Sequence, residues 1–373
     1  MDFAWSAQQD ELYEAALRFA QALPPLPIEW DQQTWWRLGQ FGLLRLSVPA
    51  GRFGMGLDAL TTARVIEAFG KAADPGLVFS ACAHLFMASM TIATHAPEAV
   101  RRRVLPRLGS GAWVGAGAIT EADAGSDIYA LKTVADRVDG GYRLNGCKTH
   151  VTNGPVADAV VVYASTNPSH GHLGISAFLV ERETPGFTRG APYEKTALAG
   201  APVGPIFLTD CRIPEENRLG AEGAGAAIFQ SAVLWERACL FALYIGAMER
   251  DLESALTHAR DRRQFGRPLG RNQAVSHRLV DMKLRLEAAR WLLYRACWLL
   301  DQGADATIPV SLAKIAVSEA ALQSGLDAMR LHGGNSFVND AGIALGLFDA
   351  LPSVTVSGTS DIQREIIARH LGL

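Results

Sequence analysis

Residues 224–248 form an almost uninterrupted apolar run in which Glu236 is the only carboxylate. The run is long enough to cross a bilayer, but Glu236 and Arg237 stand at its centre, where charged side chains are costly to insert. We therefore interpret it as a buried helix. A lone buried carboxylate takes a partner, shifts its pKa or does chemistry. Arg237 is not a facing partner, because adjacent helix residues point about 100° apart. A half-exposed position or a structural ion pair is the alternative interpretation.

The composition is that of an ordinary globular protein. The chain has 373 residues, 49% of them hydrophobic and 20% charged, with a net charge of −3. This length suffices for two or three domains, and the charge balance gives no indication of a nucleic-acid partner. The start, Met1–Trp5 followed by Asp10 and Glu11, lacks the pattern of a signal peptide. Five scattered cysteines predict reduced thiols rather than disulfides or a zinc site. We expect a cytoplasmic protein without a membrane partner.

The hydrophobic period changes twice along the chain. Residues 1–112 carry helical spacing, interrupted by stretches rich in Gly and Pro at 23–27 and 49–56. Residues 113–223 carry short runs rich in Val, Ile and aromatic residues, with a hairpin turn expected at Asp139–Gly141. The expected strands are 130–138, 142–144, 157–163, 175–181 and 206–208.

Helical spacing returns in residues 224–373. Apolar residues recur at intervals of three and four, which predicts a helix with a wide apolar face over 280–300. Its apolar positions are Val280, Leu284, Leu286, Ala289, Leu293, Ala296 and Leu300. We therefore predict an N-terminal helical domain (1–112), a middle β domain (113–223) and a C-terminal helical bundle (224–373).

A loop motif opens the β region. Thr120–Asp127 concentrates hydroxyls, small residues and backbone amides, which suit close approach to a polar heterocycle or a phosphate. Alone it could be a decorated loop, but Asn145–Lys148 and Val151–Asn153 follow at a specific distance. Gly220–Gly225 resembles part of G-x-G-x-x-G, yet no βαβ unit follows, which excludes a Rossmann site.

The C-terminal part carries further polar turns. Arg262–Gly270 places arginines at a helix start, where they suit a pyrophosphate or are simply solvated. His332–Asn335 and Ser357–Gln363 are turns before helices, and a hydroxyl in the second could simply cap the last helix. No histidine spacing indicates a metal site, and we interpret His84 as a core residue.

Together, these motifs resemble the acyl-CoA dehydrogenase family over nearly the whole chain. The stretches that carry the resemblance, in the order and spacing typical of the family, are TEADAGSD, LNGCKTHVTN, RRQFGRPLGRNQ, LHGGN and SGTSDIQREIIAR. The resemblance implies a mainly helical protein with a central β-barrel and a C-terminal four-helix bundle. It also implies a homotetramer or dimer that holds FAD.

The resemblance assigns expected roles to individual residues. The flavin ring is expected to lie against Ile119, Thr120, Ser126, His150 and Thr152, with Thr359 and Asp361 beside it. The adenine and pyrophosphate end is expected, partly across a subunit boundary, at Arg262, Phe265, Gln273, Gly333 and Gly334. Substrate contacts are expected from Ser126, Arg237 and Ser357.

The catalytic base is expected in an unusual position. Most family members carry it as a Glu two residues before the Thr of the C-terminal loop, where this chain has Ser357. A minority place it on the first helix of the bundle, and Glu236 matches that position. It would remove the proton α to a thioester carbonyl while a hydride leaves Cβ for the flavin. A desolvated Glu has the raised pKa that suits this task.

A closer likeness concerns the substrate. The stretches WERACLFALYIGAMERDLE and QAVSHRLVDMKLRLEAARWLLYRACWLLDQG resemble flavin-dependent L-prolyl-carrier-protein dehydrogenases of pyrrole-forming pathways. The resemblance implies four-electron oxidation of a prolyl thioester on a phosphopantetheinyl carrier protein. The alternatives are a dehydrogenase of a short branched acyl-CoA, a flavin monooxygenase and a non-catalytic docking or assembly protein. The electron acceptor, oxygen or another flavoprotein, stays open.

The chain departs from the family pattern at several positions. His150 stands where Trp or Phe is usual against the flavin, Arg330 where Gln is common, and Phe348 where Arg precedes Asp. Lys195–Gly200 lacks the usual Met-Gly-x-Arg. These departures bear on flavin tuning and substrate identity rather than on the fold.

Overall fold

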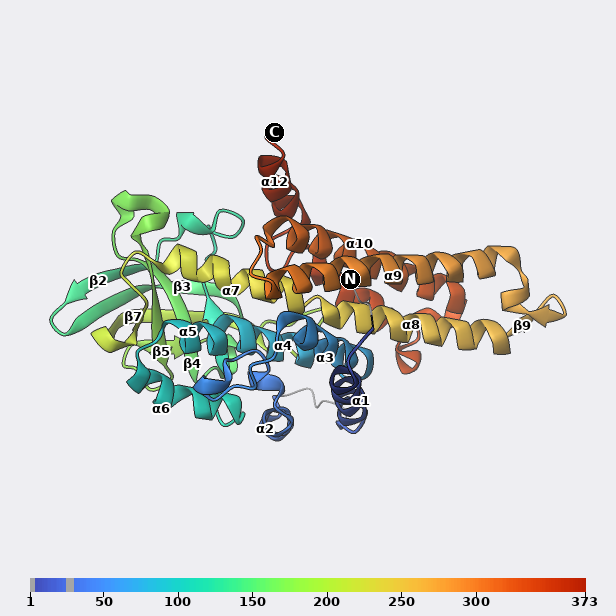
Figure 1. The fold of residues 1–373 in the computed structure, drawn as a ribbon, viewed down its shortest axis with the longest axis horizontal. Coiled ribbons are helices and arrows are strands. Elements are labelled where there is room, and N and C mark those ends of the chain that lie inside the picture. The colour runs from blue at the N-terminus through green and yellow to red at the C-terminus, as the bar shows by residue number, and fades with distance from the viewer. Residues whose placement is uncertain (1–3, 25–29) are drawn as a thin grey trace.

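The computed structural model describes residues 4–24 and 30–373. Helices form the N-terminal part, a β-sheet the middle and long helices the C-terminal part, in the order predicted (Figure 1). The first residues considered for a signal peptide, and most of the Gly- and Pro-rich stretch at 23–27, lie outside the described residues.

The N-terminal helices begin at polar caps. Ser6 and Gln9 form a capping box, which sets the start of the first helix at Ala7. Asp74 accepts a hydrogen bond from the Leu77 backbone N–H, and Pro75 occupies the first helical position. The helices are α1 (Ala7–Gln21), α2 (Gln32–Phe41), α3 (Ala59–Ala72), α4 (Pro75–Cys82), α5 (Thr91–His95) and α6 (Glu98–Gly109), with a π-helical segment, Ala83–Met90, between α4 and α5.

The middle part is one sheet of eight strands. The strands are β1 (Gly115–Ala118), β2 (Val134–Val138), β3 (Gly141–Thr152), β4 (Ala159–Ser165), β5 (Ile175–Glu181), β6 (Phe187–Arg189), β7 (Val203–Pro214) and β8 (Arg218–Leu219). Their order is β6-β7-β3-β2-β4-β5-β8, with β1 parallel to β4. This path has two ends, and no pairing among the described strands joins β6 to β8. The β character is confirmed, whereas closure into a barrel is not.

Local details of the sheet differ from the prediction. The hairpin is confirmed, because Val138 pairs with Gly141 and Gly140 adopts a φ of 77°. The strand expected from residue 130 begins only at Val134. The Glu121 carboxylate accepts hydrogen bonds from the Lys132 and Thr133 backbone N–H groups, which holds these residues out of the ladder. The sequence does not predict β1, because its residues, GAGA, include no β-branched or aromatic side chain.

The C-terminal helices are α7 (Gly225–Cys239), α8 (Ala242–Asp261), α9 (Gln273–Asp301), α10 (Thr307–His332), α11 (Ile343–Ala350) and α12 (Ser360–His370). The long helices α8, α9 and α10 pack side by side, and α3 packs on α8 (Figure 1). A short hairpin, β9 (Arg263–Gln264) and β10 (Arg267–Pro268), joins α8 to α9.

The apolar run 224–248 is helical and buried, as predicted, but it is not one helix. A turn at Leu240 and Phe241 separates α7 from α8. The stretches Pro75–His95 and Gly225–Asp261 have the length and composition of a membrane span, yet 94% and 61% of their most apolar windows are buried inside the protein. Core helices pass the same test.

One prediction for α9 is only partly right. Leu286, Ala289, Leu293 and Ala296 are buried, whereas Val280 and Leu284 are 64% and 66% exposed. Part of the apolar face of α9 is therefore left exposed in a single copy of the chain.

Candidate active site

Glu236 lies inside the protein against the C-terminal loop. Glu236 is 8% exposed, and its Oε2 accepts a hydrogen bond from Ser357 Oγ at 2.8 Å. Arg237, 9% exposed, donates from Nε to the Ser357 carbonyl oxygen at 2.6 Å. Ser357 adopts a φ of 55°, a strained conformation for a residue with a side chain. Two neighbouring residues of α7 thus hold one loop residue through its hydroxyl and its backbone.

The surroundings of Glu236 favour its neutral form. Burial raises the pKa of the Glu236 carboxyl, although the Ser357 hydrogen bond and the Arg237 charge oppose the shift. No Lys, Arg or His nitrogen of the described residues lies within 4.0 Å of this carboxylate. The half-exposed and ion-pair interpretations of Glu236 are therefore wrong. Burial also lowers the pKa of the Arg237 guanidinium.

The loop that carries Thr120 and Ser126 is anchored by a buried ion pair. Lys148 is fully buried, and its Nζ donates to Glu121 Oε1 at 2.7 Å and to the Ile119 carbonyl at 3.1 Å. Ile119 itself is buried, Thr120 is half-buried and Ser126 is exposed. Sequence reasoning missed the anchoring role of Glu121 and Lys148, although both stand in the motifs that it singled out.

The end of β3 brings His150 and Thr152 to the surface. His150 is exposed, has a φ of 53° and lies 5.4 Å from the Tyr193 ring, centroid to centroid. Thr152 is half-buried. The next residue, Asn153, is fully buried and donates to the carbonyl oxygens of Ser80 and Gly115, both at 3.0 Å. Asn153 thus fastens the end of β3 to α4 and β1.

Thr359 begins α12. Its Oγ1 accepts a hydrogen bond from the Ile362 backbone N–H at 3.1 Å, so Thr359 is the cap considered from the sequence. Asp361 is exposed in the first turn and pairs with Arg364 at 3.0 Å. Thr359 stands two residues and Asp361 four residues after Ser357, so both lie at the same end of the bundle as Glu236.

The residues expected at the adenine and pyrophosphate end lie elsewhere. The 20 residues of α8 separate Arg262 from the Glu236 region, which corresponds to about 30 Å of helix. Figure 1 shows β9 at the end of the bundle opposite the sheet. The His258 and His332 rings, 4.6 Å apart, bring the end of α10 to the end of α8. The structure thus groups these residues with one another but not with Glu236: Arg262, Phe265, Gln273, Gly333 and Gly334 are all exposed.

His84 is confirmed as a core residue. It is fully buried, and its Nδ1 accepts a hydrogen bond from the Gly115 backbone N–H at 2.8 Å. Burial lowers the pKa of its imidazole to about 3, so the ring is neutral.

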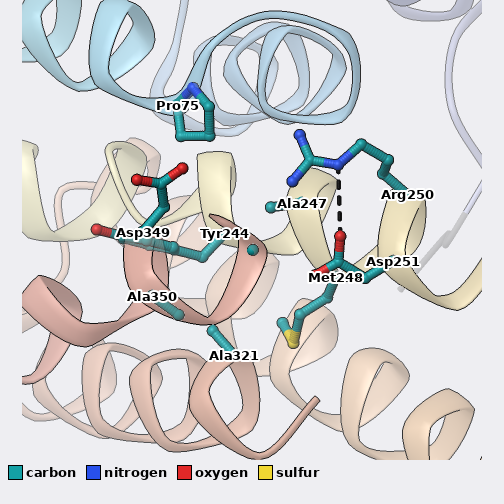
Figure 2. A pocket seen from close by; sticks show the side chains of 10 residues that line it. Pro75, Tyr244, Ala247, Met248, Arg250, Asp251, Ala321, Asp349 and Ala350 are labelled. Carbon is teal, nitrogen blue, oxygen red and sulfur yellow. Dashed lines mark hydrogen bonds and ion pairs between the residues drawn. The ribbon is translucent and has the colours of Figure 1, made fainter. Parts of the chain in front are cut away.

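A separate cavity of about 10 Å³, room for about one water molecule, lies between α4, α8, α10 and α11 (Figure 2). Asp349 Oδ1 accepts from the Leu198 backbone N–H at 2.6 Å, which ties the atypical segment Lys195–Gly200 to α11. The buried Tyr244 hydroxyl has no hydrogen-bond partner among the described residues. The cavity is not lined by Glu236, Arg237 or Ser357.

Three family models match the chain in order. They describe the N-terminal domain of acyl-CoA dehydrogenase at residues 6–112, the middle domain at 116–211 and the C-terminal domain at 223–372.

Among curated proteins, the chain is similar to an L-prolyl-[peptidyl-carrier protein] dehydrogenase of Pseudomonas fluorescens. The two are 50% identical over 341 residues, which cover 91% of this chain and 90% of the relative. A protein of the same description from Serratia is 44% identical over 385 residues, covering 100% and 99%.

Solved structures agree with these relatives. "PigA with FAD and proline" superposes with a TM-score of 0.97 at 43% identity and covers 100% of both chains. The prolyl acyl carrier protein oxidase AnaB superposes with a TM-score of 0.96 at 38% identity, covering 99% and 100%. The chain belongs to the acyl-CoA dehydrogenase family.

Proposed function

We propose that this protein is an FAD-dependent dehydrogenase that oxidises an L-prolyl thioester on a phosphopantetheinyl carrier protein to the pyrrole-2-carboxyl thioester. The observation that carries the proposal is the buried Glu236 carboxylate, held by Ser357 where most family members have the base. The relatives at 44% and 50% identity, described as prolyl-carrier dehydrogenases, support the choice of substrate.

The residues that suit FAD form two separate groups, one beside the sheet and one at the far end of the bundle. Around the sheet, Thr120, Ser126 and Thr152 offer hydroxyls, and the space beside Gly125 is open. At the far end of the bundle, a Cβ added to Gly333 or Gly334 would meet no atom within 4 Å, and Arg262 is exposed nearby. Bound FAD supplies the hydride acceptor. Because about 30 Å of α8 separates the two groups, we infer that each FAD is held by residues of two copies of the chain.

The protein's own groups handle the proton. Glu236 would take the α-proton of the thioester, and its desolvated carboxylate is a stronger base than an exposed one. Ser357 and Arg237 hold this carboxylate and the loop in place. Two rounds, each removing one proton and one hydride, would take four hydrogens from the prolyl ring, provided that an external electron acceptor, oxygen or another flavoprotein, takes up one electron pair after each round; tautomerisation gives the aromatic product.

Mass spectrometry tests the proposal. Prolyl-loaded carrier protein is incubated with the purified enzyme, and the acyl group is expected to lose four hydrogens. Oxidation of a short branched acyl-CoA alone would support the first alternative, and incorporation of oxygen would support a monooxygenase. No bound flavin and no turnover of any thioester would support a docking protein.

The hydrogen bond from Ser357 influences the pH at which activity is lost, because it lowers the pKa of the Glu236 carboxyl. Ser357→Ala removes a donor that lowers the pKa of the Glu236 carboxyl, so this pKa rises further above the ordinary glutamate value. A base acts only when deprotonated, so activity is lost as pH falls through its pKa. We expect the acidic limb of kcat/KM against pH to move up by about one pH unit. An unshifted limb would contradict Glu236 as the titrating base.

We also propose a homo-oligomer, dimer or tetramer. Exposed apolar side chains on α9 support it, because monomers rarely leave such a stripe uncovered. Among them are Val280, Leu284, Trp291, Leu292 and Trp298.

Leu284→Glu places a charge in this stripe. We expect a tetramer to become a dimer, or a dimer a monomer, as measured by the molar mass from light scattering coupled to size-exclusion chromatography. FAD content should also fall if the two groups of FAD-binding residues come from two copies of the chain. Glu11→Gln, an exposed change on α1, serves as control. A variant of unchanged mass would contradict the proposal.

Three further proposals concern organisation and location. We place the domain boundaries at 112/113 and 223/224, which the ranges of the family models support.

We infer a barrel-like middle domain, because Ala116, Tyr142, Val160, Phe178 and Ile206, from five strands, share one apolar interior. Five free cysteines, four of them buried, support a reducing cytoplasm.

A further inference from the structure

A hydrogen bond joins the middle domain to α7 at the protein surface. Gln230 Nε2 donates to Tyr129 Oη at 2.9 Å, across 101 residues of sequence. Tyr129 follows the loop Thr120–Asp127 and is 39% exposed, and Gln230 is exposed as well. On its other side, the Tyr129 ring lies 5.8 Å from the His172 ring, centroid to centroid. No sequence motif singles out any of these three residues.

Gln230 stands on α7 above Arg237, the residue that binds Ser357 next to Glu236. Gln230 and Arg237 are seven residues apart, about two turns, so they share a face of α7. Between them on this face stand Val233, which is buried, and Leu234, which is half-buried. Its hydrogen bond with Gln230 places the Tyr129 hydroxyl at the outer end of this face. Two apolar side chains thus stand between Gln230 and Arg237 on this face, and Arg237 contacts Ser357, which in turn contacts Glu236.

The hydrogen bond between Tyr129 and Gln230 is easily replaced. A neutral hydrogen bond between partly exposed side chains contributes little net stability, because water replaces either partner. Both groups can also donate and accept: Gln230 offers an amide, and Tyr129 a hydroxyl. Such a pair is suited to bind an amide that takes the place of their mutual hydrogen bond.

We propose that Tyr129 and Gln230 are positioning residues that bind an amide of the pantetheinyl arm carrying the thioester. The inference rests on the proposed function, in which the acyl group must reach Glu236 while its arm leads back to the surface. Two turns of α7 span about 11 Å, which matches the arm's second amide, the one farther from sulfur. The apolar Val233 and Leu234 then face the methylene groups between the two amides.

The test compares substrates with and without the second amide. Prolyl-carrier protein and prolyl-CoA contain the whole arm, whereas the prolyl N-acetylcysteamine thioester ends after the first amide. In the holoenzyme, Gln230→Leu and Tyr129→Phe are each expected to raise KM about 10-fold for both full-length substrates. KM for the truncated thioester, kcat and FAD content stay unchanged. Ser231→Ala, an exposed neighbour on α7, is the matched control.

Equal changes for all three substrates, or none, would overturn the inference. A change for the carrier-bound substrate alone would also overturn it, because the contact would then be with the carrier protein.

Calorimetric titration with S-methyl pantetheine separates this inference from the proposed function. Wild type is expected to bind this probe about 10-fold more tightly than Gln230→Leu. If wild type oxidises no prolyl thioester but shows this difference, the proposed function fails and the inference stands. If it oxidises prolyl-carrier protein and the variants bind the probe equally well, the inference fails alone.

Discussion

Glu236→Gln is expected to lower turnover by up to about 10⁴-fold, the upper range for loss of a general base. Glutamine has nearly the same shape and still accepts the hydrogen bond from Ser357 Oγ, so the loop and the fold are retained. Removing a charge whose burial is costly does not destabilise α7. The measurements are the steady-state oxidation rate of prolyl-carrier protein and the flavin absorbance of the purified variant.

Two comparisons sharpen this expectation. Glu11→Gln, an exposed change on α1, should keep full activity. Glu236→Ala combined with Ser357→Glu should recover part of the rate, because Ser357 Oγ already lies 2.8 Å from the carboxylate that the substitution removes. A Glu236→Gln variant with a tenth or more of wild-type turnover and full flavin content would show that the base is another group.

Arg290→Met is expected to destabilise the protein by about 3–5 kcal/mol. Arg290 on α9 pairs with Glu67 of α3 at 3.1 Å and also contacts Glu249 of α8. The Glu67 side chain is 1% exposed and accepts a further hydrogen bond from Tyr294. Without Arg290, a buried carboxylate loses its main counter-charge at the junction of the N-terminal helices and the bundle. Urea unfolding followed by circular dichroism measures the loss.

The matched control is Arg102→Met. Arg102 pairs with Glu98 at 2.7 Å, but the two side chains are 72% and 56% exposed, so water screens the pair and little or no change in the free energy of unfolding is expected. The double variant Glu67→Gln/Arg290→Met should recover part of the lost stability, because no unpaired charge then stays buried. If Arg290→Met unfolds at the same urea concentration as Arg102→Met, the network does not hold the two parts together.

Local patterns sufficed for much of the fold. The apolar run with its single carboxylate predicted a buried helix, and Asp139–Gly141 predicted the hairpin, because helical period and turn chemistry depend on neighbouring residues. Where local chemistry is weak, prediction failed: β1 has only glycine and alanine, and it is a strand because it pairs with β4. The late start of β2 depends on Glu121, more than ten residues away.

For the candidate site, the sequence by itself determined which groups are available. Glu236 and Ser357 are identified from the chain alone, as are the hydroxyl and arginine motifs expected around FAD. Only the tertiary structure decided which of them meet. It joins Ser357 to Glu236 across 121 residues and buries Lys148 under the loop of Thr120. It separates Arg262 from Glu236 by the length of α8, because a helix keeps its ends apart whatever motifs they carry.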